Sequence, residues 1–254
     1  MLSKNKIKYL RSLALKKNRT EEHVFVAEGP RLVGELLSNF QVRYIVATQN
    51  WIDENTELLH KLSITPDIVN EDELRKVSSL DTPQQVLAVL EQPKHEINPE
   101  QAIANGLCLA LDDVQNPGNL GTIVRIADWF GIKDIFCSKN TADIYNPKTV
   151  QATMGGLARV RIHYVNLPEL LATLPHSTPI YGTFLNAPSI YNTQLSSNGI
   201  IVMGNEGRGV SEEVEKLTNQ RITIPNYPAG SPTTESLNVA IATAIVCAEF
   251  RRQQ

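Results

Sequence analysis

One stretch, residues 111–131, constrains the fold more than any other part of the chain. It reads LDDVQNPGNLGTIVRIADWFG and completes an apolar run, residues 107–111. Its polar loop, rich in Asp, Asn, Pro and Gly, precedes a helical pattern in which Ile123, Ile126 and Phe130 share one face. The stretch therefore predicts a strand, a loop and a helix. Open α/β sheets place ligands at the carboxyl ends of strands arranged in this way.

Strands and helices alternate along the rest of the chain. In the front part the expected strands are 23–29, 42–48, 64–70 and 84–92, with helices at 3–17, 30–38, 53–62 and 71–79. Further on, the expected strands are 107–114, 133–138, 161–165, 179–185, 199–206 and 220–226, with helices at 119–130, 146–160, 167–174, 211–217 and 236–252. This alternation predicts an α/β protein whose second sheet is mostly parallel and covered on both faces. We expect a small α/β domain over 1–94, a linker over 95–106 and a second domain over 107–254.

The charge is unevenly distributed, although the formal net charge of the 254 residues is only −3. Residues 1–19 contain no acid and carry the basic residues Lys4, Lys6, Lys8, Arg11, Lys16, Lys17 and Arg19. A basic arm of this kind suggests a polyanionic partner. The alternative is the solvated face of an amphipathic helix, and charge alone favours neither interpretation.

The cysteines argue against a metal site and for a reducing compartment. Cys108, Cys137 and Cys247 lie in apolar surroundings, and none belongs to a CxxC pair. The amino terminus lacks the apolar core of a signal peptide. The longest uncharged apolar helix, 236–248, is too short to span a bilayer. We therefore expect a cytoplasmic protein with no bound metal and no membrane association.

A second stretch, GNEGRG at 204–209, follows an apolar strand and precedes a short helix. It is neither GxGxxG nor a P-loop, so it gives little support for a nucleotide phosphate site. The glycines alone indicate a tight turn. Glu206 and Arg125 both fall near strand carboxyl ends and could form an ion pair. Arg125 could equally pair with Asp112, Asp113 or Asp128.

A third stretch, 222–246, contains SLNV before an apolar helical pattern. Ser236 is a candidate N-cap of that helix, which is the ordinary reason for a Ser at such a place. Asn238 would then lie inside the first turn, where Asn has poor helical propensity and needs another reason to be present.

Taken together, NPGNLGTIVRIADWFG, IVMGNEGRGVSEEV and ITIP…SLNVAIATAI resemble the three motifs of the SpoU branch of the SPOUT RNA methyltransferases. The resemblance covers 107–254. VFVAEGPRLVGELL, near the front, is similar to the accessory domain of the same branch, a small α/β unit like certain RNA-binding ribosomal proteins. The resemblance implies a parallel sheet with a deep trefoil knot, an exception to the unknotted topology of most folds. It also implies a homodimer formed through the knot.

The resemblance assigns site residues as well. S-adenosylmethionine would contact Gly204, Ile224 and Leu237, with Thr183 nearby. The catalytic and substrate-orienting residues would be Asn119, Arg125, Glu206, Ser236 and Asn238. The reaction would be methyl transfer to a ribose 2′-hydroxyl, whose proton must leave as the methyl group arrives. Arg125 would be essential, either as a base of strongly perturbed pKa or as an anchor for phosphate and the developing alkoxide.

The substrate implied is structured RNA, with 23S ribosomal RNA favoured and tRNA the runner-up. Lys4, Lys8, Arg11, Lys16, Lys17 and Arg19 would bind its backbone. A catalytically silent RNA-binding or ribosome-assembly factor is the rival hypothesis, which cofactor binding would discriminate. A third hypothesis, a nucleotide-dependent enzyme, finds no support because the sequence contains no phosphate-binding fingerprint. Two features depart from the family pattern: the long loop 225–235, and Ala240 at a position where serine is frequent. Both would alter the wall of the cofactor pocket without removing it.

Overall fold

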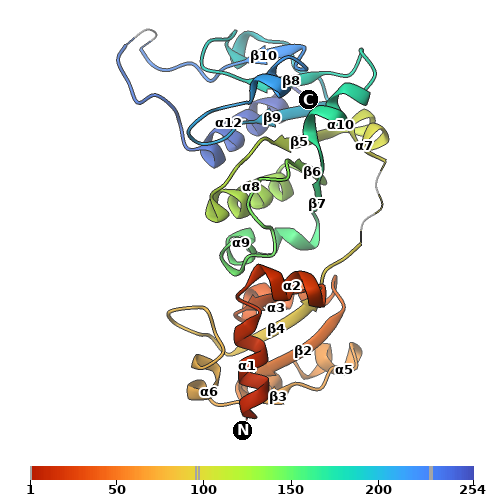
Figure 1. Cartoon of the computed structure of the whole chain (residues 1–254), viewed down its shortest axis with the longest axis vertical. Coiled ribbons are helices and arrows are strands. Elements are labelled where there is room, and N and C mark those ends of the chain that lie inside the picture. Colours follow the sequence, from red (N-terminus) through yellow and green to blue (C-terminus); the bar gives the residue numbers. More distant parts are fainter. Residues whose placement is uncertain (1, 95, 97, 229–230) are drawn as a thin grey trace. The chain divides into compact units, whose positions relative to one another are not determined.

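The computed structural model of the protein describes residues 2–94, 96, 98–228 and 231–254. The chain forms two compact units (Figure 1). Unit 1 contains residues 1–94 together with Asp143–Ala158, and unit 2 contains residues 95–142 together with Arg159–Gln254. Five positions fall outside the described residues: Met1, His95 and Ile97 of the expected linker, and Ala229 and Gly230 of the long loop.

Unit 1 is built on a four-stranded sheet. Its strands are β1 (Val24–Glu28), β2 (Val42–Ala47), β3 (Asp67–Ile68) and β4 (Val86–Glu91), in the order β1-β4-β2-β3. β4 is antiparallel to both of its neighbours, whereas β2 and β3 are parallel. β1 is buried along its whole length, because its apolar, mostly β-branched or aromatic residues are covered on both faces. The core on one face includes Leu10, Leu13, Val26 and Val89.

The helices of unit 1 are shorter than the sequence predicts. They are α1 (Lys4–Ser12), α2 (Lys16–Glu22), α3 (Pro30–Leu37), α4 (Gln49–Glu54), α5 (Thr56–Lys61) and α6 (Glu71–Arg75). The expected single helix over 3–17 is interrupted after Ser12. Side chains of α2 bind the free carbonyls there: the Asn18 amide donates to Ser12 O, and Arg19 Nη1 donates to Leu13 O and Ala14 O. These bonds satisfy the backbone carbonyls at the carboxyl end of α1, where the chain turns into α2.

The segment Asp143–Ala158 packs with unit 1, although it lies within the range expected for the second domain. It forms α9 (Pro147–Thr153) and the short 3₁₀ helix η1 (Gly156–Ala158). The ring of Tyr145 lies against Phe25, with the ring centroids 5.1 Å apart. Arg19 Nη2 donates to the Asp143 carboxylate at 2.7 Å. An aromatic contact and a buried ion pair therefore attach this segment to β1 and α2.

Unit 2 contains a six-stranded sheet in which every neighbouring pair is parallel. The order is β10-β8-β9-β5-β6-β7, and the strands are β5 (Leu107–Leu111), β6 (Asp134–Cys137), β7 (Arg161–Tyr164), β8 (Ile180–Thr183), β9 (Gly199–Met203) and β10 (Gln220–Ile222). The predicted α/β fold with a parallel second sheet is confirmed. The predicted trefoil knot stays a prediction.

Helices cover both faces of this sheet (Figure 1). They are α7 (Pro99–Asn105), α8 (Pro117–Trp129), α10 (Leu167–Thr173), α11 (Glu212–Glu215) and α12 (Val239–Arg252), with the 3₁₀ helix η2 at Ile190–Asn192. α7, α10 and α11 bury apolar side chains against Cys108, Phe136 and Val202. α8 and α12 pack against each other. The central strands β5 and β9 are buried throughout. Because they are parallel neighbours, the loops that follow their carboxyl ends meet at one edge of the sheet.

Candidate functional site

The first loop of the site leads from β5 into α8. α8 begins at Pro117, and Asn116 is its N-cap. The Asn116 side-chain oxygen accepts from the backbone N–H groups of Gly118 and Asn119, at 2.8 and 3.2 Å. Pro at the first helical position and Asn at the cap are favourable choices for a helix start. The cap places Asn119 in the first turn of α8, where its side chain reaches the neighbouring loops.

Glu206 binds this first loop from the turn that follows β9. Its carboxylate accepts from the backbone N–H groups of Gln115 and Asn116, at 3.2 and 3.1 Å, and from Asn119 Nδ2 at 3.0 Å. Burial raises the pKa of the Glu206 carboxyl, but the hydrogen bonds from Asn119 and the backbone outweigh burial and hold the pKa below its ordinary value. Glu206 is therefore an ionised acceptor that fixes Asn119.

Asn238 connects the third motif to the same place. It is the N-cap of α12, because its side-chain oxygen accepts from the N–H groups of Ala240 and Ile241, at 3.0 and 3.3 Å. Its Nδ2 atom donates to Asn119 Oδ1 at 3.0 Å. Glu206, Asn119 and Asn238 thus form one hydrogen-bonded chain that joins the three predicted motifs.

Ser236 does not cap the helix, contrary to the N-cap hypothesis. Asn238 takes that position, two residues later, and Ser236 is exposed before the helix begins. Within the described residues Ser236 makes no hydrogen bond. The structure therefore does not bring Ser236 into the hydrogen-bonded chain of the other motif residues.

Arg125 is exposed on α8, six positions after Asn119. The three carboxylates considered as its partners are bound elsewhere: Asp112 accepts from Ser211 N, Asp113 from Arg208, and Asp128 from Arg159. Glu206 accepts from Asn119 and the backbone. Over the described part of the chain, no ion pair or hydrogen bond engages the Arg125 side chain. Its guanidinium is thus available to an incoming group.

Asp113 supports the site in a role that was not anticipated from the sequence, where it was considered only as a possible partner of Arg125. Its φ of 59° is in the left-handed region, which non-Gly residues seldom occupy. Its carboxylate accepts from Ser138 Oγ at 2.5 Å and Arg208 Nη2 at 3.4 Å, and its carbonyl accepts from Asn205 Nδ2 at 2.7 Å. Asp113 therefore ties the loops after β5, β6 and β9 together. The available signal was only a polar residue within two positions of the end of each of these strands.

Gly204 and Thr183, two predicted cofactor contacts, have structural roles. A Cβ atom on Gly204 would lie 2.2 Å from the Gly209 carbonyl carbon, so the turn admits only glycine there. Asn205 and Gly209 close that turn with two backbone hydrogen bonds of 2.9 Å. The Thr183 hydroxyl donates to Val202 O at 2.9 Å and links β8 to β9.

The other two predicted cofactor contacts offer free backbone donors. Ile224 is half-buried, and Leu237 is 49% exposed. Neither backbone N–H donates a hydrogen bond within the described ranges. Both groups can therefore bind a ligand without first breaking a protein bond.

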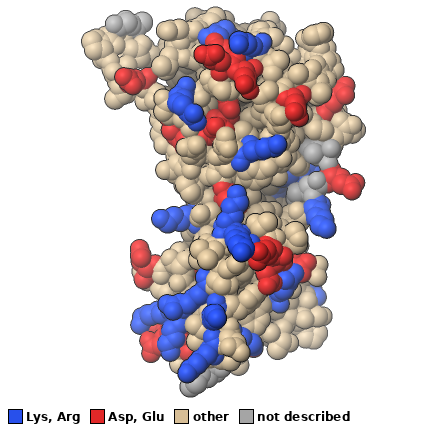
Figure 2. Space-filling model, in the orientation of Figure 1, with Lys and Arg blue, Asp and Glu red and all other residues tan. Residues whose placement is uncertain are grey.

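The predicted RNA contacts of unit 1 separate into two kinds. Lys4, Lys8, Arg11, Lys16 and Lys17 are exposed. Figure 2 shows Lys and Arg gathered over the part of unit 1 where α1 lies. Arg19 is a correction: it is 1% exposed and is bound by Asp143 and two backbone carbonyls, so it cannot contact RNA.

The described residues contain neither a metal-ligand cluster nor a helix that could cross a membrane. No group of three or more His, Cys, Asp or Glu side chains is arranged to hold a metal ion there. None of the helices in this part of the chain has the length and apolar character needed to cross a bilayer. Cys108, Cys137 and Cys247 are free and buried.

Comparison with known proteins identifies the family. The SpoU rRNA methylase family matches residues 106–248, and the MRM3-like substrate binding domain matches residues 4–88. The 23S rRNA (guanosine(2553)-2′-O)-methyltransferase RlmP of Bacillus subtilis is 31% identical over 97% of this chain and 96% of its own length.

Solved structures agree with this assignment. A TrmH-family protein from Porphyromonas gingivalis has a TM-score of 0.87 and 42% identity, covering 100% of both chains. The AdoMet-bound rRNA methyltransferase of Sinorhizobium meliloti has a TM-score of 0.84 and 28% identity, covering 99% of this chain and 96% of that one. The resemblance inferred from the motifs is confirmed, and the chain belongs to the SpoU rRNA methylase family.

Proposed function

We propose that this protein transfers the methyl group of S-adenosylmethionine to a ribose 2′-hydroxyl of RNA, and that 23S ribosomal RNA is the substrate. The observation that carries the proposal is the chain of hydrogen bonds from Glu206 through Asn119 to Asn238. It is joined by Arg125, six positions after Asn119 on α8, whose side chain has no hydrogen-bond or ion-pair partner within the described residues. Family membership and the named 23S rRNA methyltransferase from Bacillus subtilis support the reaction and the substrate.

The residues expected to hold the cofactor fit its chemistry. An adenosine moiety needs hydrogen-bond donors and apolar walls, and the free N–H groups of Ile224 and Leu237 are such donors. The exposed side chain of Leu237 and that of Leu185, which is 71% exposed, offer apolar surface. Gly204 leaves no side chain at the end of β9. When bound, the cofactor supplies an electrophilic methyl group on a sulfonium.

Arg125 is the residue we propose to meet the substrate. Its free guanidinium can bind the phosphate beside the target ribose and stabilise negative charge on the 2′-oxygen as its proton leaves. Asn119, held from both sides by Glu206 and Asn238, would orient the ribose. The unpartnered hydroxyl of Ser236 would supply a further polar contact. The ionised Glu206 acts on Asn119 and the loop, so we assign it a positioning role.

We also propose that the protein works as a homodimer. Trp129 on α8 is 84% exposed and Ile241 on α12 is 54% exposed, and these two helices pack against each other within unit 2. Aromatic side chains such as that of Trp129 are enriched at protein interfaces. Sedimentation equilibrium of wild type and of Trp129→Asp tests this, because a monomeric wild type would contradict it. We expect the enzyme to act in the cytoplasm, on RNA bound by the basic face of unit 1.

Methyl transfer by Arg125→Ala tests the proposed function. We expect wild type to bind S-adenosylmethionine in a calorimetric titration and to transfer the radiolabelled methyl to in vitro transcribed 23S rRNA. Arg125→Ala should bind the cofactor but lose at least about 100-fold in rate, the usual effect of removing one charge-stabilising donor. Lys133→Ala is the matched control, since Lys133 is an exposed cation at the opposite, amino end of β6.

Two outcomes would contradict these assignments. A folded wild type that does not bind the cofactor would favour the silent RNA-binding factor. Transfer by Arg125→Ala at the rate of Lys133→Ala would remove Arg125 from the reaction.

A further inference from the structure

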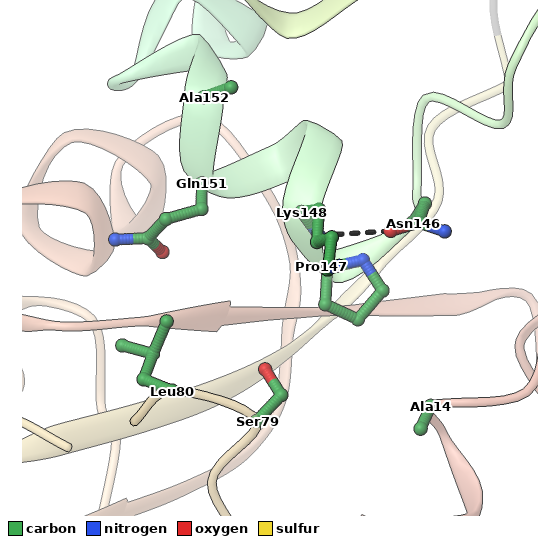
Figure 3. Close-up of a pocket in the computed structure, with 8 residues that line it drawn as sticks. All are labelled: Ala14, Ser79, Leu80, Asn146, Pro147, Lys148, Gln151 and Ala152. Atoms are coloured by element: carbon green, nitrogen blue, oxygen red, sulfur yellow. Dashed lines mark hydrogen bonds between the residues drawn. The ribbon is translucent and has the colours of Figure 1, made fainter. Parts of the chain in front are cut away.

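A pocket of about 480 Å³ opens within unit 1, where α9 faces the loop after α6 and the turn after α1 (Figure 3). It adjoins a second pocket of about 230 Å³, and the two share Ala14, Ser79 and Pro147 as lining residues. The volume of the larger pocket is in the range of small-ligand sites. Neither the methyl-transfer residues nor the expected cofactor contacts line them.

The larger pocket combines an apolar wall with polar groups that have no partner. Leu80, Pro147 and Ala152 provide the apolar surface (Figure 3). Asn146 Oδ1 is occupied by the N–H of Lys148. By contrast, the Gln151 carboxamide and the Lys148 ammonium make no hydrogen bond or ion pair in the described part of the chain. A carboxamide that is free to donate and accept can read the edge of a base.

The charge around both pockets favours an anion. Arg11 lines the smaller pocket and, over the described residues, has no side-chain partner. Glu28 is the acid of that lining, and it is 5% exposed. Its carboxylate already accepts from the hydroxyls of Ser78 and Ser79 and from Ser79 N at 3.0 Å. The two cations therefore remain available, whereas the single carboxylate is occupied.

We propose that this pocket binds one unstacked nucleotide of the RNA substrate. Its base lies on the apolar wall of Leu80 and Pro147, its edge meets the Gln151 carboxamide, and its phosphates meet Lys148 and Arg11. A nucleotide can use an apolar platform, a free amide and two cations together, and proteins bind unpaired RNA in this manner. The proposal rests on the proposed function, since it takes RNA to be the substrate, and it adds α9 to the RNA-binding surface.

Binding of labelled 23S rRNA transcript by the full chain tests the pocket. We expect Gln151→Ala to weaken binding about threefold to tenfold, the worth of a lost hydrogen bond. The control Gln41→Ala, exposed and outside the pocket, should leave the affinity unchanged. Lys148→Gln should weaken binding more than Lys61→Gln and reduce the salt slope by about one phosphate contact. Equal effects of each variant and its control would overturn the proposal.

Cross-linking locates the nucleotide directly. We expect a transcript containing 4-thiouridine to cross-link to peptides that include residues 79–80 or 146–152, and Gln151→Ala to lower that yield. Cross-links confined to other peptides of a chain that binds the RNA would overturn the pocket assignment. Titration with S-adenosylmethionine separates this failure from failure of the proposed function: a chain that binds cofactor and methylates RNA without using the pocket loses only the present inference.

Discussion

The ion pair between Arg19 and Asp143 should be a main support of unit 1. The Arg19 side chain is 2% exposed and that of Asp143 is 16% exposed. In the wild type the Asp143 carboxylate also accepts from the N–H of Tyr145 at 3.0 Å, and an Asn side chain keeps that acceptor. The substitution Asp143→Asn, however, leaves the buried guanidinium of Arg19 without a counter-charge. Breaking a fully buried pair costs about 3–5 kcal/mol. Because Asp143 is partly exposed and Asn still accepts a hydrogen bond, we expect a loss of about 2–3 kcal/mol.

Urea unfolding followed by Trp51 fluorescence measures this loss. Trp51 is 1% exposed in unit 1, whereas Trp129 is 84% exposed in unit 2, so a Trp129→Phe background makes Trp51 a probe of unit 1 alone. With a slope of about 1.5 kcal/mol per M, the midpoint should fall by about 1.3–2 M. Asp72→Asn is the control, because Asp72 pairs with Arg75 at 3.3 Å but is 81% exposed. Equal midpoints for the two variants would refute the reasoning.

Three further predictions concern unit 2. Gly204→Ala should destabilise the turn after β9 by about 1–3 kcal/mol, the usual cost of overpacking. The control Gly207→Ala should not, because its Cβ would have no neighbour nearer than 3.7 Å. Thermal unfolding distinguishes the two variants, and equal melting temperatures would contradict the steric argument. Because the pKa of Glu206 is lowered in the folded protein, its hydrogen bonds should persist as the pH falls through the ordinary Glu value of about 4.3 and be lost only below it. The Asn119 side-chain amide signal in an NMR titration reports this, and a midpoint above 4.3 would be inconsistent with it. Asn238→Asp should keep the cap of α12 but lose the donor to Asn119, so the thermal stability should be unchanged while the rate of methyl transfer falls. Asn238→Ala should lower both the stability and the rate, because losing the cap costs about 1 kcal/mol.

Much of unit 2 could be predicted from the sequence because apolar runs at regular intervals specify a buried parallel sheet. Once the strands are parallel, the polar loops after β5 and β9 must meet at one edge, and the loops that hold Asn119 and Glu206 do so. The choice of these two residues as site residues came from the resemblance of the motifs to the SpoU branch. The start of α12 was harder to predict. Ser236 and Asn238 are both good caps, and local propensity does not choose between them. Asn238 is the N-cap in the structure, and it also donates a hydrogen bond to Asn119, 119 positions earlier in the chain, which local propensity does not reveal.

Arg19 shows a second limit of sequence reasoning. It belongs to a basic run, and its neighbours Lys16 and Lys17 are exposed as predicted for that run. Its burial depends on Asp143, 124 positions away, and on carbonyls freed by a helix break that periodicity did not reveal. Asp113 was missed for a similar reason, since its role depends on Ser138 and Asn205 from other loops.

The chain of hydrogen bonds from Glu206 through Asn119 to Asn238 also has a consequence for biosynthesis. Its first member, Asn119, is made long before its last, and Asn238 is held in place only when α12 has formed behind it. A nascent polypeptide that has exposed β5, α8 and β9 therefore still lacks one end of the chain. Contacts between distant positions also slow folding, because the intervening loop must be closed before they form. We expect ribosome-bound fragments ending before residue 238 to bind RNA through unit 1 but not to methylate it, so that competence for methyl transfer arises only after residue 238 and α12 have been made.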